Sequence, residues 1–261
     1  MSVARGEHIT AVMSELLHHL PLILSTFFVA GGVKGVIGLG LPTVAMGVLG
    51  TVMVPAEAAA LLLIPSALTN VWQMISGPRL APLLRRLWPM MATVCVGTLL
   101  GSGLISGNGG RYATMALGAA LAAYSVLGLS GKRFEVASRD EKWLGPMIGL
   151  STGVICGATG VFVIPAVPYL AALGLERDDL VQALGLSFTV STFALAIGLA
   201  WHHALPAQTL GVSLLALVPA LLGMAAGGAI RAIVSPATFR FFFYVGLLGL
   251  GGEILWRALS E

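Results

Sequence analysis

The chain has 261 residues, of which 57% are hydrophobic and only 10% are charged, and its formal net charge is +3. Soluble globular domains carry roughly 25% charged residues, so this composition excludes a separate soluble domain and indicates a polytopic membrane protein surrounded by lipid. The 14 basic residues are spread through short loops, which excludes a nucleic-acid-binding face.

The first 20 residues carry Glu7, Glu15 and three histidines ahead of any apolar run. They lack the basic region and the small-residue cleavage site of a signal peptide, so we expect this stretch to be retained. Apolar runs then predict eight segments, at about 20–50, 56–77, 87–106, 112–130, 143–173, 179–201, 208–232 and 237–258.

Segments 20–50 and 143–173 are each too long for one membrane crossing of about 20 residues and too short for two. Both are interrupted by glycine and proline, which break helices, so each is predicted to form two half-helices joined by an irregular tip. The first contains Gly31, Gly32, Gly35, Gly38, Gly40 and Pro42, and the second contains Gly149, Gly153, Gly157, Gly160, Pro165 and Pro168.

The two halves of the chain resemble each other. The run GVIGLGLPTVAMGVLGTVMVP, from Gly35, aligns with GATGVFVIPAVPYLAALGLE, from Gly157, at an offset of about 122, and the next helix aligns at an offset near 123. We predict an all-α membrane domain of two inverted repeats, residues 1–130 and 143–261, joined by a cytoplasmic linker at 131–142. Each repeat would hold one broken or re-entrant glycine-rich hairpin and three transmembrane helices.

Basic residues favour re-entrant hairpins. If both long segments return to their starting side, one face of the membrane carries ten arginines and lysines and the other three, with both termini outside the cytoplasm. The ten are Arg79, Arg85, Arg86, Lys132, Arg133, Arg139, Lys142, Arg177, Arg231 and Arg240, and the three are Arg5, Arg111 and Arg257. Irregular backbone at membrane depth must be buried or line a wet cavity, so we expect the tips to meet near the midplane around a substrate.

Lys34 lies among glycines, several residues deep in an otherwise uncharged segment. An intramembrane charge costs at least about 2.5 kcal/mol and is a functional hypothesis by default. A cation beside glycine amides and half-helix N-termini suits an anion. The alternative is that Lys34 snorkels to the interface.

The tip glycines also admit two interpretations, since they could expose amides to a ligand or permit close helix packing. The helix after the first hairpin carries a polar stripe of Ser66, Thr69, Asn70 and Gln73. Asn70 and Gln73 share a helix face with Ser66 and are expected in or near the cavity. A matching stripe, Ser187, Thr189, Ser191 and Thr192, follows the second hairpin and suits either the cavity or interhelical hydrogen bonds. Cys156, the counterpart of Lys34, and Thr159 occupy the second tip, where the thiol could contact substrate or serve as a small apolar group.

Motifs of common enzyme families are absent from the sequence, which has no HExxH, GxSxG or P-loop. The cysteines and histidines lack metal-ligand spacing, so neither a catalytic centre, a metal nor a cofactor is predicted. Without an ATP site, transport would be secondary or channel-like.

The hairpin GGVKGVIGLGLP, the helix AEAAALLLIPSALTNVWQ and the second hairpin GVICGATGVFVIP resemble the TauE/SafE sulfite exporter family over essentially the whole chain. The resemblance implies secondary transport of sulfite or an organosulfonate through the bacterial inner membrane, coupled to an ion gradient. By position, Gly31 to Pro42, Asn70 and Gly153 to Pro165 match the family's hairpins and polar helix. Lys34 and Cys156 depart from that pattern, which leaves the substrate open.

The sequence thus predicts an anion permease that works by alternating access, with a proton or sodium ion as the coupling ion. The candidate substrate-binding residues are Gly31, Gly32, Lys34, Gly35, Gly38, Gly40, Pro42, Asn70, Gln73, Gly153, Cys156, Gly157, Thr159, Gly160 and Pro165. A passive anion channel and a membrane enzyme acting on a lipid or isoprenoid are the alternatives.

Overall fold

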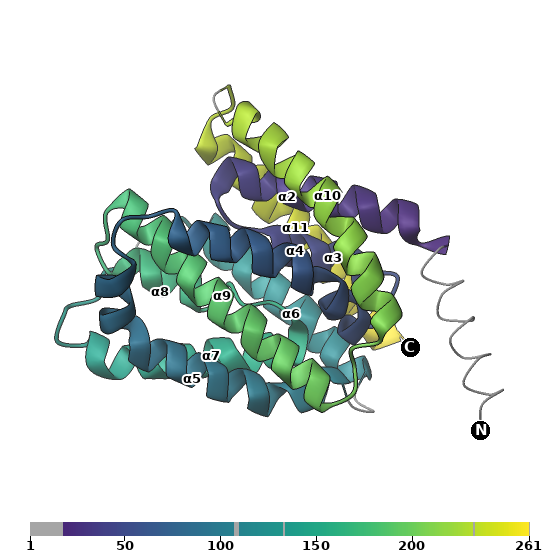
Figure 1. The fold of residues 1–261 in the computed structure, drawn as a ribbon, viewed down its shortest axis with the longest axis horizontal. Helices are drawn as coiled ribbons and strands as arrows, with labels where there is room; N and C mark the ends of the chain where they lie inside the picture. The colour runs from purple at the N-terminus through teal and green to yellow at the C-terminus, as the bar shows by residue number, and fades with distance from the viewer. Residues whose placement is uncertain (1–17, 107–109, 133, 232, 261) are drawn as a thin grey trace.

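The computed structural model describes residues 18–106, 110–132, 134–231 and 233–260. Most of the N-terminal stretch therefore lies outside the described residues. The described chain is all-helical (Figure 1), with α2 (Leu20–Ile37), α3 (Leu41–Leu49), α4 (Pro55–Ile75), α5 (Leu80–Ser106), α6 (Gly110–Leu129), α7 (Glu141–Thr159), α8 (Ala166–Ala172), α9 (Arg177–Trp201), α10 (Ala207–Ile230) and α11 (Pro236–Ser260).

Seven of the described helices, namely α2, α4, α5, α6, α9, α10 and α11, are long and apolar enough to cross a membrane. The chain is thus a multi-pass membrane protein. The predicted breaks in the two long segments are confirmed, because α2 gives way to α3 after Ile37 and α7 gives way to α8 after Thr159. Gly38 and Gly160 end these helices with φ of 77° and 72°, a conformation that favours glycine.

The helix boundaries give the spacing between corresponding points in the two halves of the chain. The ends of α2 and α7, at Ile37 and Thr159, differ by 122 positions, and so do the starts of α4 and α9, at Pro55 and Arg177. The sequence alignment places the second helix at an offset near 123, within one residue of this separation.

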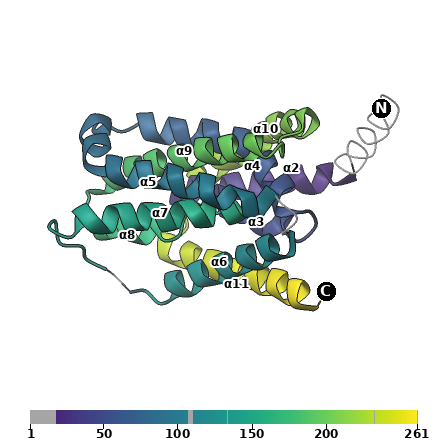
Figure 2. The same ribbon diagram turned by 90° about the horizontal axis from the view of Figure 1, so that it is seen from below.

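Helices α4 and α9 pack on each other through the middle of the fold. Figure 1 shows this pair between two others, α2 with α10 and α5 with α7. Helices α6 and α11 pack together as a further layer, visible in Figure 2. The same view places the C-terminus at the opposite end of the helical body from the linker that precedes α7.

Small residues allow the outer pairs to approach closely. A Cβ atom built on Gly97 of α5 would lie 2.3 Å from the carbonyl oxygen of Leu150 on α7, and one on Gly223 of α10 would lie 1.9 Å from that of Phe28 on α2. Helices in lipid gain little from hydrophobic burial and associate through such van der Waals contact. Gly101 and Gly227 lie at the same two crossings, where a Cβ would be 2.4 Å from the Val154 carbonyl oxygen and 2.1 Å from that of Gly32.

Candidate functional site

Lys34 lies in the last turn of α2, just before the first helix break. The Gly38 N–H donates to the Lys34 carbonyl at 2.8 Å, which ends α2 one turn after Lys34. Gly40 also has a positive φ, 104°, and Pro42 lies buried in the first turn of α3. The break therefore depends on two glycines whose backbone conformation other residues rarely adopt.

The Lys34 side chain is only 5% exposed and lies against α4. Its Nζ donates to Thr69 Oγ1 at 3.1 Å and to Asn70 Oδ1. No carboxylate among the described residues pairs with it. Lys34 thus does not snorkel to a surface, and its two partners are neutral oxygens.

Asn70 extends this contact from α4 to α9. Its amide nitrogen donates to Thr192 Oγ1 at 3.2 Å. The hydroxyls of Thr69 and Thr192 each donate at 2.7 Å to the carbonyl four residues earlier in their own helices. Their protons are therefore engaged, and their oxygen lone pairs face the lysine and the amide. We call Lys34, Thr69, Asn70 and Thr192 the lysine cluster.

The second break is built on the same plan with different side chains. The Gly160 N–H donates to the Cys156 carbonyl at 2.7 Å. Thr159 Oγ1 accepts the Val161 N–H at 3.1 Å and so supports the break. Cys156, buried, holds its Sγ 3.9 Å from the Ser191 carbonyl oxygen of α9. Pro165 precedes the first turn of α8.

The two breaks lie on different sides of the α4–α9 pair. Lys34 contacts Asn70 on α4, whereas Cys156 contacts Ser191 on α9. The second break reaches the first broken segment at Met46 of α3, whose Sδ lies 3.0 Å from a Cβ built on Gly160. We expected the glycine tips to meet, but the contact runs through this methionine.

Four predicted site glycines lie at helix crossings. A Cβ on Gly31 or Gly35 would meet carbonyl oxygens of α10 at 2.0 and 2.2 Å, and one on Gly153 or Gly157 would meet those of α5 at 2.3 and 2.2 Å. A Cβ on Gly32 would lie 3.7 Å from the carbonyl oxygen of Gly223 on α10. Close packing accounts for the absence of a side chain at the four crossings.

Gln73 is separate from the lysine cluster. Its amide donates to the Val181 carbonyl of α9 at 3.0 Å, one turn beyond Asn70. Three buried hydroxyls, those of Ser66, Ser187 and Ser191, make no hydrogen bond with any described residue. Buried polar groups without a protein partner are commonly met by water or ligand, and these flank the cluster on α4 and α9.

Sequence reasoning placed Thr69 and Thr192 in polar stripes without assigning them to the site. Spacing is the signal that could have found them, because Thr69 adjoins Asn70 and Thr192 follows Asn70 by 122 positions, the offset at which the two hairpins align in sequence. Phe243 of α11, whose ring would lie 3.2 Å from a Cβ on Gly40, was missed altogether. It sits in an aromatic run that is typical of any lipid-facing helix.

The family model described as Sulfite exporter TauE/SafE matches residues 23–254, a range that includes both breaks and the lysine cluster. None of the curated proteins matches the chain, and neither does any solved structure. Because the family match covers nearly the whole chain, the protein belongs to the TauE/SafE sulfite exporter family, whose members are membrane transporters and not enzymes.

Proposed function

We propose that this protein is a secondary permease for a small anion of the sulfite or organosulfonate class, working by alternating access and driven by a proton or sodium gradient. Lys34 would bind the anion, with Asn70 and Thr69 orienting its ammonium group. The backbone around Gly38, Gly40 and Gly160 would offer further polar contacts where the helices are interrupted.

The observation that carries the proposal is the burial of Lys34 without a carboxylate partner in the described chain. A buried cation is costly unless an opposite charge or several hydrogen bonds compensate it. Neutral oxygens of Thr69 and Asn70 compensate Lys34 only in part. A transported anion would supply the negative charge that Lys34 lacks among its described neighbours. Release of the anion would leave Lys34 uncompensated again, which would favour a change of conformation at the site.

The arrangement of the helices supports two inverted repeats with re-entrant hairpins. Under the offset of 122, α2 corresponds to α7 and α5 corresponds to α10 within the helix order. The pair α2–α10 is then the counterpart of the pair α7–α5, so the broken segment of each repeat packs against a helix of the other repeat. Rocking of one repeat against the other would expose the α4–α9 interface to either side in turn.

The distribution of basic residues supports an orientation with the linker in the cytoplasm and both termini outside it, in the inner membrane. In that orientation α2 and α3 enter from outside and return, whereas α7 and α8 enter from the cytoplasmic side. The two helix breaks would then lie at the depth of the lysine cluster.

Uptake into proteoliposomes tests the proposal. Labelled sulfite, sulfoacetate, taurine and sulfate are offered separately, with and without a pH gradient, and then with a sodium gradient. We expect saturable uptake of at least one of these anions that a gradient accelerates. Protein-free liposomes are the control for leakage.

Two outcomes would overturn the proposal in different ways. Transport of a cation or a neutral solute but of no anion would remove the assigned role of Lys34. Anion flux that neither saturates nor responds to a gradient of protons or sodium would instead identify a passive channel that uses the same residues.

A further inference from the structure

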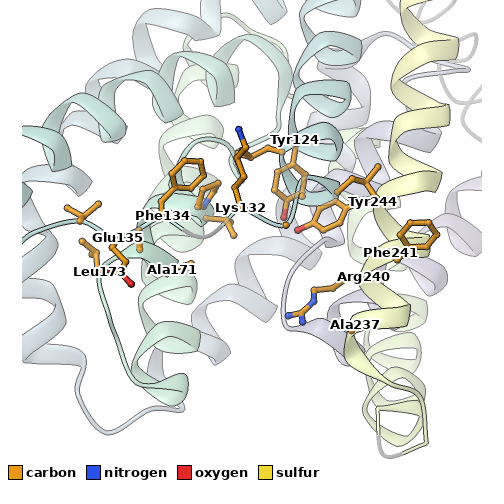
Figure 3. Close-up of a pocket in the computed structure, with 18 of the residues that line it drawn as sticks. Tyr124, Lys132, Phe134, Glu135, Ala171, Leu173, Ala237, Arg240, Phe241 and Tyr244 are labelled. Carbon is orange, nitrogen blue, oxygen red and sulfur yellow. The ribbon is translucent and has the colours of Figure 1, made fainter.

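A cavity of about 920 Å³ lies away from the lysine cluster, between the end of α6, the linker, α8 and the start of α11. Figure 3 shows its walls, with the linker and α8 facing α11 across the opening. Its volume is typical of small-molecule sites. Among the described residues, the charged side chains of its lining are Lys132, Glu135 and Arg240.

Only 10% of the residues in the chain are charged, so three charged side chains around one cavity stand out. None of them forms an ion pair with any residue that the structure describes. Arg240 extends from α11 toward the opposite wall (Figure 3), and its guanidinium presents planar donors suited to an oxyanion. Two cations against one carboxylate favour an anionic occupant.

Aromatic rings form part of the cavity wall. Tyr124 and Tyr244, which line it, pack edge to face with ring centroids 5.3 Å apart, and Phe243 packs on both. Tyr124 is 2% exposed, and its hydroxyl lies near that of Tyr244 (Figure 3). The two phenols therefore place their hydroxyl groups together beside the cavity that both residues line.

Phe243 lies between this cavity and the first helix break. The side chain is 8% exposed, and its ring atoms lie 3.2 and 3.3 Å from the position of a Cβ on Gly40. Gly40 follows the cap that Gly38 places on the Lys34 carbonyl. A chain of contacts therefore runs from the two tyrosines of the cavity lining through Phe243 to the first break, one turn from Lys34.

We propose that the cavity is the linker-side vestibule of the transport path, in which Arg240 binds the small anion before it passes Phe243 to reach Lys34. This inference rests on the proposed function for the identity of the ligand. Phe243 acts as the partition that keeps water and anion from Lys34 while the linker side is closed. The Tyr124 and Tyr244 hydroxyls offer hydrogen bonds to the anion on its way.

A labelling experiment tests the path without requiring transport. Lys34→Cys is introduced into a background with Cys95→Ala and Cys156→Ala, and a membrane-impermeant methanethiosulfonate reagent is applied from the linker side. Phe243→Ala should accelerate labelling by about tenfold or more, because a rarely opened partition becomes permanently open. Phe242→Ala is the matched control, since Phe242 is the adjacent phenylalanine and is 67% exposed.

Equal labelling rates in Phe243→Ala and Phe242→Ala would overturn the proposal that Phe243 separates a vestibule from Lys34. Phe243→Leu retains an apolar side chain of intermediate size and should give an intermediate rate. It keeps the test valid if the alanine variant does not elute as a folded monodisperse species. Labelling results stand even if uptake experiments identify a different solute, so the two proposals fail separately.

Anion capture at Arg240 has its own test. Arg240→Gln should raise the KM for the transported anion by about 2- to 10-fold in vesicles of neutral phosphatidylcholine alone. Arg231→Gln, which removes an exposed arginine outside the cavity lining, should leave KM unchanged. An effect of Arg240→Gln seen only when anionic lipid is present would show that the arginine binds headgroups and would overturn its role in capture.

Discussion

Asn70 and Thr192 lie 122 positions apart in the sequence, and the amide of one donates to the hydroxyl of the other at 3.2 Å. That separation equals the offset between the helix breaks and between the starts of α4 and α9. Equivalent residues of two repeats can touch only close to the axis that relates the repeats. Lys34, bonded to Asn70, therefore lies beside the proposed axis, where alternating access would be centred.

Lys34→Gln is expected to lower anion uptake. The variant keeps a hydrogen-bonding side chain but removes the charge, and hydrogen bonds to charged groups contribute about 1.5–3 kcal/mol. We expect kcat/KM for the anion to fall by roughly 10- to 100-fold. Uptake into proteoliposomes measures it, with Lys142→Gln, an exposed lysine of α7, as the control.

Unchanged anion affinity in Lys34→Gln would assign this lysine a structural role. Lys34→Arg separates charge from shape, because the guanidinium keeps the positive charge but is larger and more rigid than the ammonium that bonds to Thr69 and Asn70. We expect partial uptake from it.

The bond between Asn70 and Thr192 should be measurable as an interaction energy. A double-mutant cycle with Asn70→Ala and Thr192→Val, followed by unfolding in mixed micelles, should give a coupling near 0.6 kcal/mol, the average for such bonds between membrane helices. Asn70→Ala alone should cost more than Thr192→Val, because it also removes a partner of buried Lys34. Additive single effects would contradict the bond.

Adjacent glycines on α10 provide a matched pair. A Cβ on Gly227 would lie 2.1 Å from the Gly32 carbonyl oxygen, whereas one on Gly228 meets nothing within 4 Å. Gly227→Ala should therefore destabilise the protein by about 1–3 kcal/mol, as overpacking does. Gly228→Ala should be neutral, and thermal unfolding in detergent compares them. Equal stability of the two variants would show that α2 and α10 pack less closely than described.

Pro65 and Ser213 should be energetically coupled. Proline at position 65 has no N–H, so the Leu61 carbonyl in α4 loses its usual helical partner. Ser213 of α10 donates its hydroxyl to that carbonyl at 2.6 Å. Ser213→Ala should cost about 1–3 kcal/mol of stability, the penalty for an unsatisfied buried group.

The rescue experiment uses Pro65→Ala, which restores an N–H opposite the Leu61 carbonyl. In that background Ser213→Ala should cost much less, and the difference between the two costs is read from unfolding curves. If the cost of Ser213→Ala is the same in both backgrounds, the serine does not replace the missing helical bond.

Local chemistry made much of the fold predictable. The helix breaks at Gly38 and Gly160 follow from glycines in the left-handed region close to prolines, and the long apolar runs follow from the membrane. Composition and the charge of Lys34 within an apolar segment pointed to a membrane transporter with a site between the two glycine-rich tips. All of these signals act within a few residues of one another along the chain.

Contacts between distant segments were decided only by tertiary packing. The sequence left two roles open for the tip glycines, and the crossings of α2 with α10 and of α7 with α5 explain Gly31, Gly35, Gly153 and Gly157. Likewise, Phe243 is one of several aromatic residues in α11 until the fold sets its ring against Gly40.

The sequence by itself therefore determined that a lysine lies beside a broken helix in a membrane protein. The tertiary structure decided that Lys34 faces Thr69 and Asn70 instead of the membrane surface. The physical reason is that the rotation of a helix about its own axis depends on the neighbours it packs against, and those neighbours come from residues more than 30 positions away.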